Sequence, residues 1–250
     1  MLHYHLQGEG PVWVFLHGFL ESSTMWAALP LEKLPIQCVF IDLPGHGQSE
    51  LSDGNPSIKS MAHEVEKVLH FLKVDQFTIV GHSMGAYVGL ELAQCHGFQK
   101  LILLNSNCWS DSEQKKQDRL RVAQLVQHAK SHFIREAIPN LFAMPQLHPF
   151  FIEGLMEEAN KMTPEAIAYA ALAMRERADF TEYVNANPDR FIFIHGKLDR
   201  LVSVAELQSK IKGPQIHILD CGHMAHVEAG AEIMSIIEVE IFLNKDQNII

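Results

Sequence analysis

The sequence lacks several features that mark particular classes of protein. No apolar run approaches the roughly 20 residues that a membrane-spanning helix needs. Only 4 cysteines occur in 250 residues, without C-x-x-C spacing, so a disulfide framework is not expected. The first residues lack the charged start and apolar stretch of a signal peptide. We therefore expect a cytoplasmic protein with free thiols and no membrane partner.

Positive charge is also scarce. Lys and Arg total 20 against 30 Asp and Glu, which gives a formal net charge of −10. The densest cationic stretch, residues 115–121, is interleaved with acidic residues, as is typical of a solvated helix face. Nucleic acid is therefore not an expected partner. The 15 histidines come without an H-E-x-x-H motif, so no metal ion is expected.

What is present is an alternation of short apolar runs with longer amphipathic stretches. The runs predicted as strands are Val12–Leu16, Cys38–Ile41, Phe77–Val80, Leu101–Leu104, Phe191–Ile194 and Ile216–Leu219. The stretches predicted as helices are Trp26–Leu34, Ile58–Leu72, Ala86–His96, Val204–Ile211 and Ala231–Leu243. This alternation predicts an α/β fold with a mostly parallel central sheet and helices on both faces.

One segment, residues 108–187, shows helical patterns and no convincing strand. Its predicted helices are Glu113–Phe133, Pro149–Lys161 and Pro164–Glu176. We interpret it as a helical cap inserted into a core made of residues 1–107 and 188–250. Five of its apolar residues are expected either to line a substrate site or to form the core of the cap itself. These are Trp109, Phe142, Met144, Phe150 and Phe151.

The motif Gly81-His82-Ser83-Met84-Gly85 has the form G-x-S-x-G and lies between a predicted strand and a predicted helix. In this context a serine sits on a strained turn with its hydroxyl exposed above the sheet, and the glycines let strand and helix approach closely. The helix N-terminus also favours negative charge beside Ser83. Ser83 is therefore the candidate nucleophile.

A serine nucleophile needs a base and an acid that orients the base. Asp199 and His223 each follow a predicted strand downstream of Ser83, so both are expected at the same sheet edge. Three other residues were weighed and are less favoured: Asp220 and Glu228 as the acid, and His226 as the base. The oxyanion of such a reaction needs two N–H donors, and we expect them from Met84 and Phe19.

This ordered set of motifs resembles the α/β-hydrolase fold superfamily. The segments that carry the resemblance are His17–Phe19, Asp42–Ser49, Gly81–Gly85, His195–Asp199 and Gly222–Glu228. The resemblance implies Ser83 as nucleophile, Asp199 as acid, His223 as base, and Phe19 and Met84 as oxyanion donors. Haloalkane dehalogenases and epoxide hydrolases share this layout but carry Asp at the nucleophile position, so Ser83 argues against both.

We expect a carboxylesterase-like serine hydrolase that cleaves a small ester or related acyl substrate, without a cofactor, as a monomer or homodimer. One alternative is a lyase similar to a menaquinone-pathway synthase, with Arg119 or Arg121 as cationic anchors. That synthase is associated with Asn-Pro-Gly where this chain has Asn105-Ser106-Asn107. Another alternative is a ligand receptor on a hydrolase scaffold.

Overall fold

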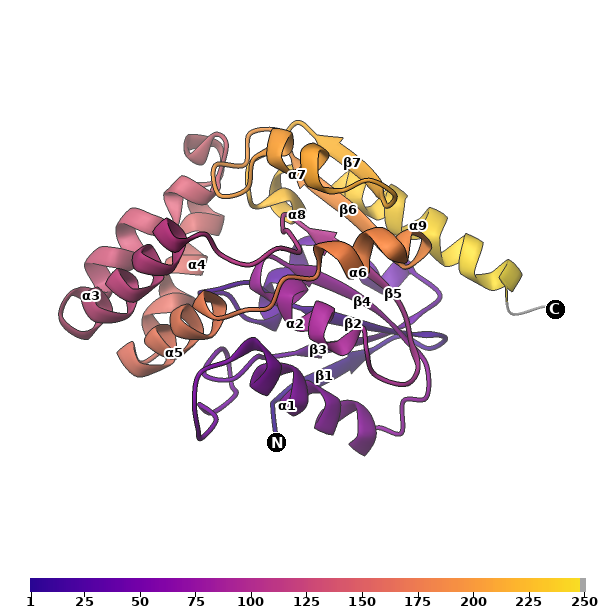
Figure 1. Ribbon diagram of the computed structural model, residues 1–250, viewed down its shortest axis with the longest axis horizontal. Coiled ribbons are helices and arrows are strands. Elements are labelled where there is room, and N and C mark those ends of the chain that lie inside the picture. The colour runs from indigo at the N-terminus through magenta and orange to yellow at the C-terminus, as the bar shows by residue number, and fades with distance from the viewer. Residues whose placement is uncertain (248–250) are drawn as a thin grey trace.

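A seven-stranded sheet forms the centre of the computed structural model, which describes residues 1–247 (Figure 1). The strands are β1 (Tyr4–Gln7), β2 (Val12–Leu16), β3 (Gln37–Ile41), β4 (Phe77–His82), β5 (Phe98–Leu104), β6 (Phe191–Gly196) and β7 (Gln215–Leu219). Their order is β1-β3-β2-β4-β5-β6-β7. Only β1 pairs antiparallel, with β3, and the other neighbours are parallel. The predicted mostly parallel α/β fold is confirmed.

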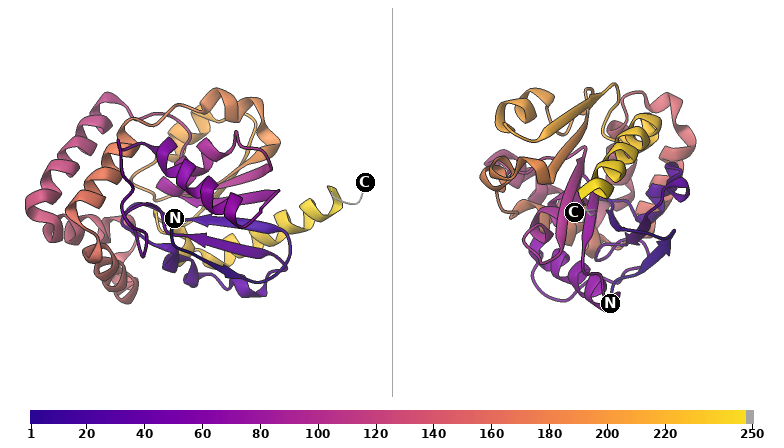
Figure 2. Two further views of the ribbon diagram at one scale, coloured as in Figure 1. Left: turned by 90° about the horizontal axis from the view of Figure 1, so that it is seen from below. Right: turned by 90° about the vertical axis from the view of Figure 1, so that its right-hand side faces the viewer.

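Helices cover both faces of this sheet (Figure 2). The α-helices are α1 (Ile58–Phe71), α2 (Met84–Leu92), α3 (Glu113–Ala137), α4 (Pro149–Lys161), α5 (Pro164–Arg175), α6 (Thr181–Ala186), α7 (Val204–Lys210), α8 (Ala225–Glu228) and α9 (Gly230–Gln247). The 3-10 helices are η1 (Ser23–Ala28), η2 (Leu31–Lys33), η3 (Pro139–Leu141), η4 (Pro145–Leu147) and η5 (Pro188–Arg190). One apolar cluster joins the sheet to α1, α2, α6 and α7, and a second joins it to η1 and α9. Within the described residues, no helix has the length and apolar character required to cross a membrane.

Three local features differ from the prediction. The stretch Trp26–Leu34 forms η1 and η2 rather than one helix, because Pro30 with ψ 59° lies outside the helical region between them. The helix expected over Ala86–His96 ends at Leu92. Strand β1 was not predicted: it is an edge strand whose two central residues are exposed, so it carries no apolar run.

The segment from α3 through α5, here called the cap, lies over one end of the sheet, and its apolar cluster also includes Leu20 and Met224 of the core (Figure 1). The two chain segments that connect the cap to the core are joined, since Phe180 N–H donates to Cys108 O at 2.7 Å. After this junction the chain returns to the sheet, because Val184 of α6 packs in the main cluster. Because Tyr169 and Met174 of α5 belong to the same cluster, this packing does not set the limits of the insertion, and its extent over residues 108–187 stays a prediction.

Candidate active site

Ser83 occupies a sharp turn between β4 and α2. Its backbone angles are φ 49° and ψ −112°, a region that an L-residue rarely adopts. A side chain at Gly81 would place its Cβ 2.6 Å from Ala86 N, and one at Gly85 would lie 2.2 Å from Leu16 O. Both positions therefore require glycine, because backbone atoms cannot move aside. This is the geometry expected of a nucleophile elbow.

His223 and Asp199 meet at the same edge of the sheet as Ser83. His223 Nδ1 lies 2.8 Å from Asp199 Oδ2, and both side chains are buried. Asp199 follows β6 and His223 follows β7, and the carboxyl ends of parallel strands converge on one edge. Among the described residues, no hydrogen bond joins Ser83 Oγ to His223. In a ligand-free enzyme this bond is often long and tightens with substrate.

The Asp199 carboxylate is held by four groups. Oδ1 accepts hydrogen bonds from the N–H groups of Leu201 and Val202, at 2.8 and 3.3 Å. Oδ2 accepts from His223 and from Asn105 Nδ2, the latter at 3.1 Å. Burial alone would raise the pKa of Asp199, but the charge and hydrogen bond of His223 outweigh burial and hold that pKa well below its ordinary range. Asp199 is therefore an anion that keeps a proton on His223 Nδ1.

Met84 and Phe19 are the two residues whose N–H groups are predicted to bind an oxyanion beside Ser83. Met84 is the first residue of α2, so its N–H has no acceptor within the helix. In the turn at the end of β2, the amides of Gly18 and Glu21 are bonded within the turn itself. The hydrogen bonds of the described residues do not include one from Phe19 N–H. Phe19 lines the same cavity as Ser83, as the prediction of a second donor requires.

A cavity of about 650 Å³ lies between the cap and the core, and both Ser83 and His223 line it. Ligand pockets typically measure about 300–1,000 Å³. The lining combines apolar residues, among them Leu20, Val122 and Phe133, with charged ones. Its charged residues have both signs: Lys115, Arg119, Arg177 and Lys210 are basic, and Glu21, Asp111, Asp118, Asp179 and Glu206 are acidic.

Of the five apolar residues considered for the substrate site, only Trp109 lines this cavity. Phe142 is 1% exposed within the cluster of the cap, so its bulk stabilises the cap. Met144, Phe150 and Phe151 are at least half exposed and lie outside the cavity wall. Phe142 thus takes the alternative role, in the core of the cap, that the sequence leaves open, because an apolar pattern does not say which residues turn toward a cavity.

The less favoured residues have other partners. Asp220 faces Lys197 on the surface. Glu228 accepts hydrogen bonds from Gly222 N–H and Ala143 N–H, which ties the loop of the base to the cap. His226 is buried behind the site, and burial lowers its pKa to about 3.

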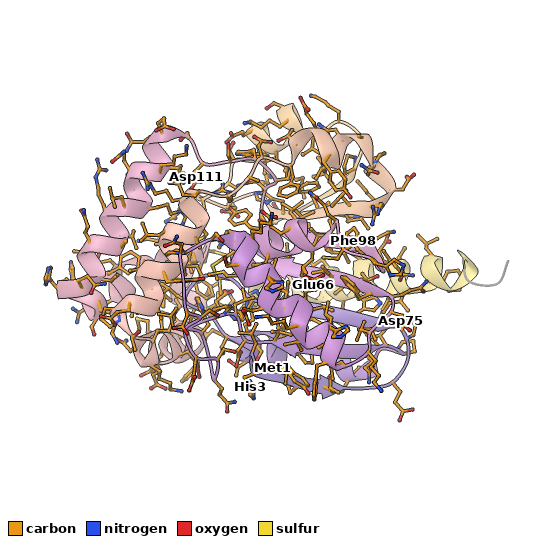
Figure 3. The ribbon with its side chains drawn as sticks, turned by 60° about the horizontal axis from the view of Figure 1, so that its bottom comes forward. Met1, His3, Glu66, Asp75, Phe98 and Asp111 are labelled. Carbon is orange, nitrogen blue, oxygen red and sulfur yellow. The ribbon has the colours of Figure 1, made fainter. Side chains whose placement is uncertain are left out.

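The two arginines considered as lyase anchors are both paired. Arg119 lines the cavity but binds Asp111 at 3.3 Å. Arg121 is mostly exposed, binds Asp118 at 2.8 Å and does not line the cavity. Asp111, at the start of α3 where the cap meets the core, also binds Arg177 at 2.6 Å (Figure 3). Its carboxylate thus neutralises part of the positive charge of both guanidinium groups.

Three residues at the site were missed by sequence reasoning as functional candidates: Glu21, His82 and Asn105. Asn105 has φ 48° and bridges Asp199 to Gly222 O. His82 contacts Glu21 although 61 positions separate them. The only signal in the sequence was the place of His82 inside the serine motif, and no local pattern shows which partner it binds. Among the described residues, no group of three or more His, Cys, Asp or Glu is arranged to hold a metal ion.

Comparison with known proteins relates this arrangement to one family. The model of the alpha/beta hydrolase family matches residues 13–235. A thermophilic esterase from Thermogutta terrifontis is 27% identical, with a TM-score of 0.87 over 98% of this chain and 93% of that one. An enol-lactonase from Burkholderia xenovorans LB400 is 23% identical, with a TM-score of 0.83 over 94% of each chain, which shows the shared fold.

Curated relatives point to more than one activity. A Haemophilus influenzae protein named as a putative 2-succinyl-6-hydroxy-2,4-cyclohexadiene-1-carboxylate synthase is 24% identical over 86% of this chain and 91% of that protein. Three mycobacterial relatives are 34% identical over 92 residues, a match that spans only 27% of their length. The family model, by contrast, covers most of the chain. The chain therefore belongs to the alpha/beta hydrolase family.

Proposed function

We propose that this protein is a serine hydrolase that cleaves a small ester or related acyl substrate through an acyl-enzyme. The observation that carries the proposal is the convergence of three side chains from distant parts of the chain. Ser83 stands on a strained turn and lines the cavity, and His223 lines the same cavity while Asp199 holds its other ring nitrogen. This is the nucleophile, base and acid arrangement of acyl transfer.

The chemistry follows from the hydrogen bonds of the site. Because His223 Nδ1 donates to Asp199, Nε2 is the nitrogen that accepts the proton of Ser83 Oγ as Oγ attacks the substrate carbonyl. The Phe19 and Met84 amides stabilise the resulting oxyanion, each by about 3–4 kcal/mol. His223 then protonates the leaving alcohol, and water, deprotonated by His223, releases the acid from Ser83. Asp199 stabilises the imidazolium in both steps.

The cavity supports an acyl substrate without a large net charge. Its lining combines apolar residues with charged residues of both signs. An apolar acyl chain therefore gains burial against the apolar residues, and polar parts of a substrate find polar partners in the same cavity. The esterase from Thermogutta terrifontis, similar in both sequence and structure, supports the same substrate class.

The test is a panel of p-nitrophenyl esters, lactones and thioesters. We expect multiple turnovers of short-chain esters, and Ser83→Ala should reduce kcat by at least about 10³-fold, as for other triad nucleophiles. Ser235→Ala changes an exposed serine of α9 and should leave turnover unchanged. Full activity of Ser83→Ala would contradict the mechanism. One equivalent of nitrophenol without further turnover would indicate the receptor function instead.

A synthase-like lyase is the second candidate, because the Haemophilus influenzae relative is aligned over most of both chains. Against it, the two candidate anchors Arg119 and Arg121 are each bound to an acidic residue. The two activities differ in their product. Release of pyruvate from the substrate of that synthase, measured with lactate dehydrogenase, would favour the lyase, and its absence beside rapid ester turnover would favour the hydrolase.

A further inference from the structure

An ion pair that the proposed mechanism does not use lines the cavity beside Ser83. His82 Nδ1 is 2.8 Å from Glu21 Oε2, and each side chain is 1% exposed. His82 immediately precedes Ser83, whereas Glu21 comes from the turn that follows β2. The pair therefore joins two loops of the candidate active site through the protein interior.

The partners of His82 define its charge. Its Nδ1 faces a carboxylate oxygen, and its Nε2 lies 2.9 Å from the backbone carbonyl of His223. Both partners accept hydrogen bonds, so both ring nitrogens carry a proton and the ring is an imidazolium. Glu21 Oε2 also accepts from Gly18 N–H, which favours the carboxylate form. The charge of His82 lowers the pKa of Glu21 to about 2 even though burial alone would raise it.

We propose that His82 and Glu21 form a charged pair that positions the oxyanion loop and the loop of the base relative to Ser83. This inference rests on the proposed function, because it assigns those loops their roles. Through Glu21 the pair holds Gly18, whose neighbour Phe19 supplies an oxyanion donor. Through Nε2 it holds the backbone of His223 itself. His82 and Glu21 are thus positioning residues that connect the turn of Ser83 to the oxyanion loop and to the loop of the base.

The packing around the pair leaves little freedom. A Cβ at Gly18 would lie 2.4 Å from Glu21 Oε2 and 2.7 Å from His82 Nδ1, so the pair itself requires glycine there. The rings of His223 and His226 lie 5.0 and 5.2 Å from that of His82. Burial and the nearby charge of His82 lower the pKa of His226, which leaves His226 neutral.

Stability alone does not explain such a pair. Burying two charges costs several kcal/mol of desolvation per ion, and apolar replacements of buried pairs are often neutral or stabilising. Glu21 Oε1 is moreover buried without a hydrogen-bond partner among the described residues. The pair is costly to bury, and one oxygen of Glu21 lacks a hydrogen-bond partner. We therefore explain the pair by the loops around Ser83 that it holds in place.

The test compares Glu21→Gln, His82→Gln and the double variant with the wild type on p-nitrophenyl acetate. Active sites are counted with a fluorophosphonate that labels Ser83. The rate is then divided by the number of labelled sites, so that misfolded protein does not lower the measured kcat. We expect kcat per labelled site to fall about 10- to 100-fold with KM within twofold, because displaced loops impair the transition state more than binding. The double variant should fall no further than the single variants, since the pair acts as a unit.

A matched control is the buried pair of Lys100 and Glu240, which joins β5 to α9 away from the cavity. Glu240→Gln should lower Tm and leave kcat per labelled site unchanged. Histidine-selective NMR should show both ring nitrogens of His82 protonated at pH values where a free imidazole, with a pKa of about 6.5, is neutral. The resonance is identified by its loss in His82→Gln.

Three results would overturn the inference: a neutral His82, single variants with wild-type kcat per labelled site, or losses that multiply in the double variant. If instead the wild type neither reacts with the fluorophosphonate nor turns over esters, the proposed function fails. The two failures are therefore distinguishable.

Discussion

Ser83 has a backbone conformation that costs an L-residue about 1–3 kcal/mol, and its surroundings maintain it. Ser83 N–H donates to Leu104 O at 3.0 Å, and Ser106 Oγ donates to Ser83 O at 2.8 Å. Both contacts come from the end of β5, the neighbouring strand. The strain at Ser83 is thus maintained by hydrogen bonds from the end of the neighbouring strand.

Asp199→Asn tests the role of the acid. The variant keeps the shape of the side chain, but a carboxamide does not stabilise a charged His223 and favours the wrong imidazole tautomer. We expect kcat to fall by about 10⁴-fold, which is the loss seen when the triad acid of a serine protease is changed to Asn. Steady-state ester hydrolysis measures it. Asn105→Ala removes only one of the hydrogen bonds to Asp199 and should cause a much smaller loss. Equal losses of kcat in the two variants would contradict the larger role of the Asp199 carboxylate.

Glu21 also predicts a pH dependence of stability. Its pKa falls from an ordinary 4.5 to about 2 on folding, so its contribution is present above pH 4.5 and is lost as the pH falls toward 2. His82 is protonated in both folded and unfolded states over this window, because its folded pKa is raised above 6.5. Glu21→Gln should therefore lose less stability on acidification than the wild type. Urea unfolding followed by tryptophan fluorescence measures the difference, and parallel pH curves would contradict it.

At the level of elements, packing requires glycine at one helix position and leaves another open to substitution. At Gly85 in α2 a Cβ would lie 2.2 Å from Leu16 O and 2.6 Å from His17 O, because this helix crosses β2 in direct backbone contact. At Gly154, exposed in α4, a Cβ would meet nothing within 4 Å. Packing thus requires glycine in α2, whereas glycine in α4 only adds backbone flexibility.

This contrast gives a prediction for stability. Gly154→Ala should raise the free energy of unfolding by about 0.5–1 kcal/mol, because alanine loses less backbone entropy on folding. Gly85→Ala should lower it by about 1–3 kcal/mol or more, since backbone atoms cannot move away from the new methyl group. Urea denaturation of the two variants measures both changes. A destabilised Gly154→Ala would contradict the helical conformation of α4 at this position.

The cap has a buried cluster of its own side chains and also packs on the core, since Tyr169, Ala170 and Met174 of α5 belong to the main cluster. Its buried cluster includes Ile134, Phe142 and Ile167, drawn from three separate segments of the cap. Glu228, beside the loop of the base, accepts a hydrogen bond from Ala143 N–H of the cap. The cap therefore forms one wall of the cavity and is also hydrogen-bonded to the loop that carries His223.

For the whole molecule, the space between cap and core decides which acyl groups fit. Ala137 lies in the last turn of α3 and lines the cavity. Ala137→Phe should narrow the cavity, so KM for octanoyl esters should rise about tenfold or more while acetyl esters are hydrolysed as before. Ala231→Phe adds the same bulk at an exposed position of α9 and should change neither KM value. An equal rise for both chain lengths would place the acyl group elsewhere.

The C-terminal helix shows how the molecule extends beyond its core. Helix α9 packs on the sheet through Ile233 and Ile237 and then projects away from the body, on the side opposite the cap (Figure 1). Near its end Phe242 is 66% exposed. The cap and the distal part of α9 are thus remote from each other, so the far turns of α9 do not contact the cavity.

Much of the fold followed from the sequence alone, because buried parallel strands require apolar runs and the connecting helices require amphipathic stretches. The predicted strands were all found, and the helix Pro149–Lys161 was found with its predicted bounds. The order of Ser83, Asp199 and His223 likewise placed these residues at strand ends on one sheet edge. Their catalytic roles remain a prediction that the experiments above test.

Only the tertiary structure decided which apolar residues of the cap face the cavity and which buried polar groups are partners. Trp109 lines the cavity and Phe142 does not, although both are equally apolar, because the answer depends on how the segments between the helices fold onto the core. The pairing of His82 with Glu21 joins residues that no local pattern connects. Periodicity is a property of neighbouring residues, whereas long-range contacts are set by the packing of whole elements, and substrate fit and loop positioning depend on those contacts.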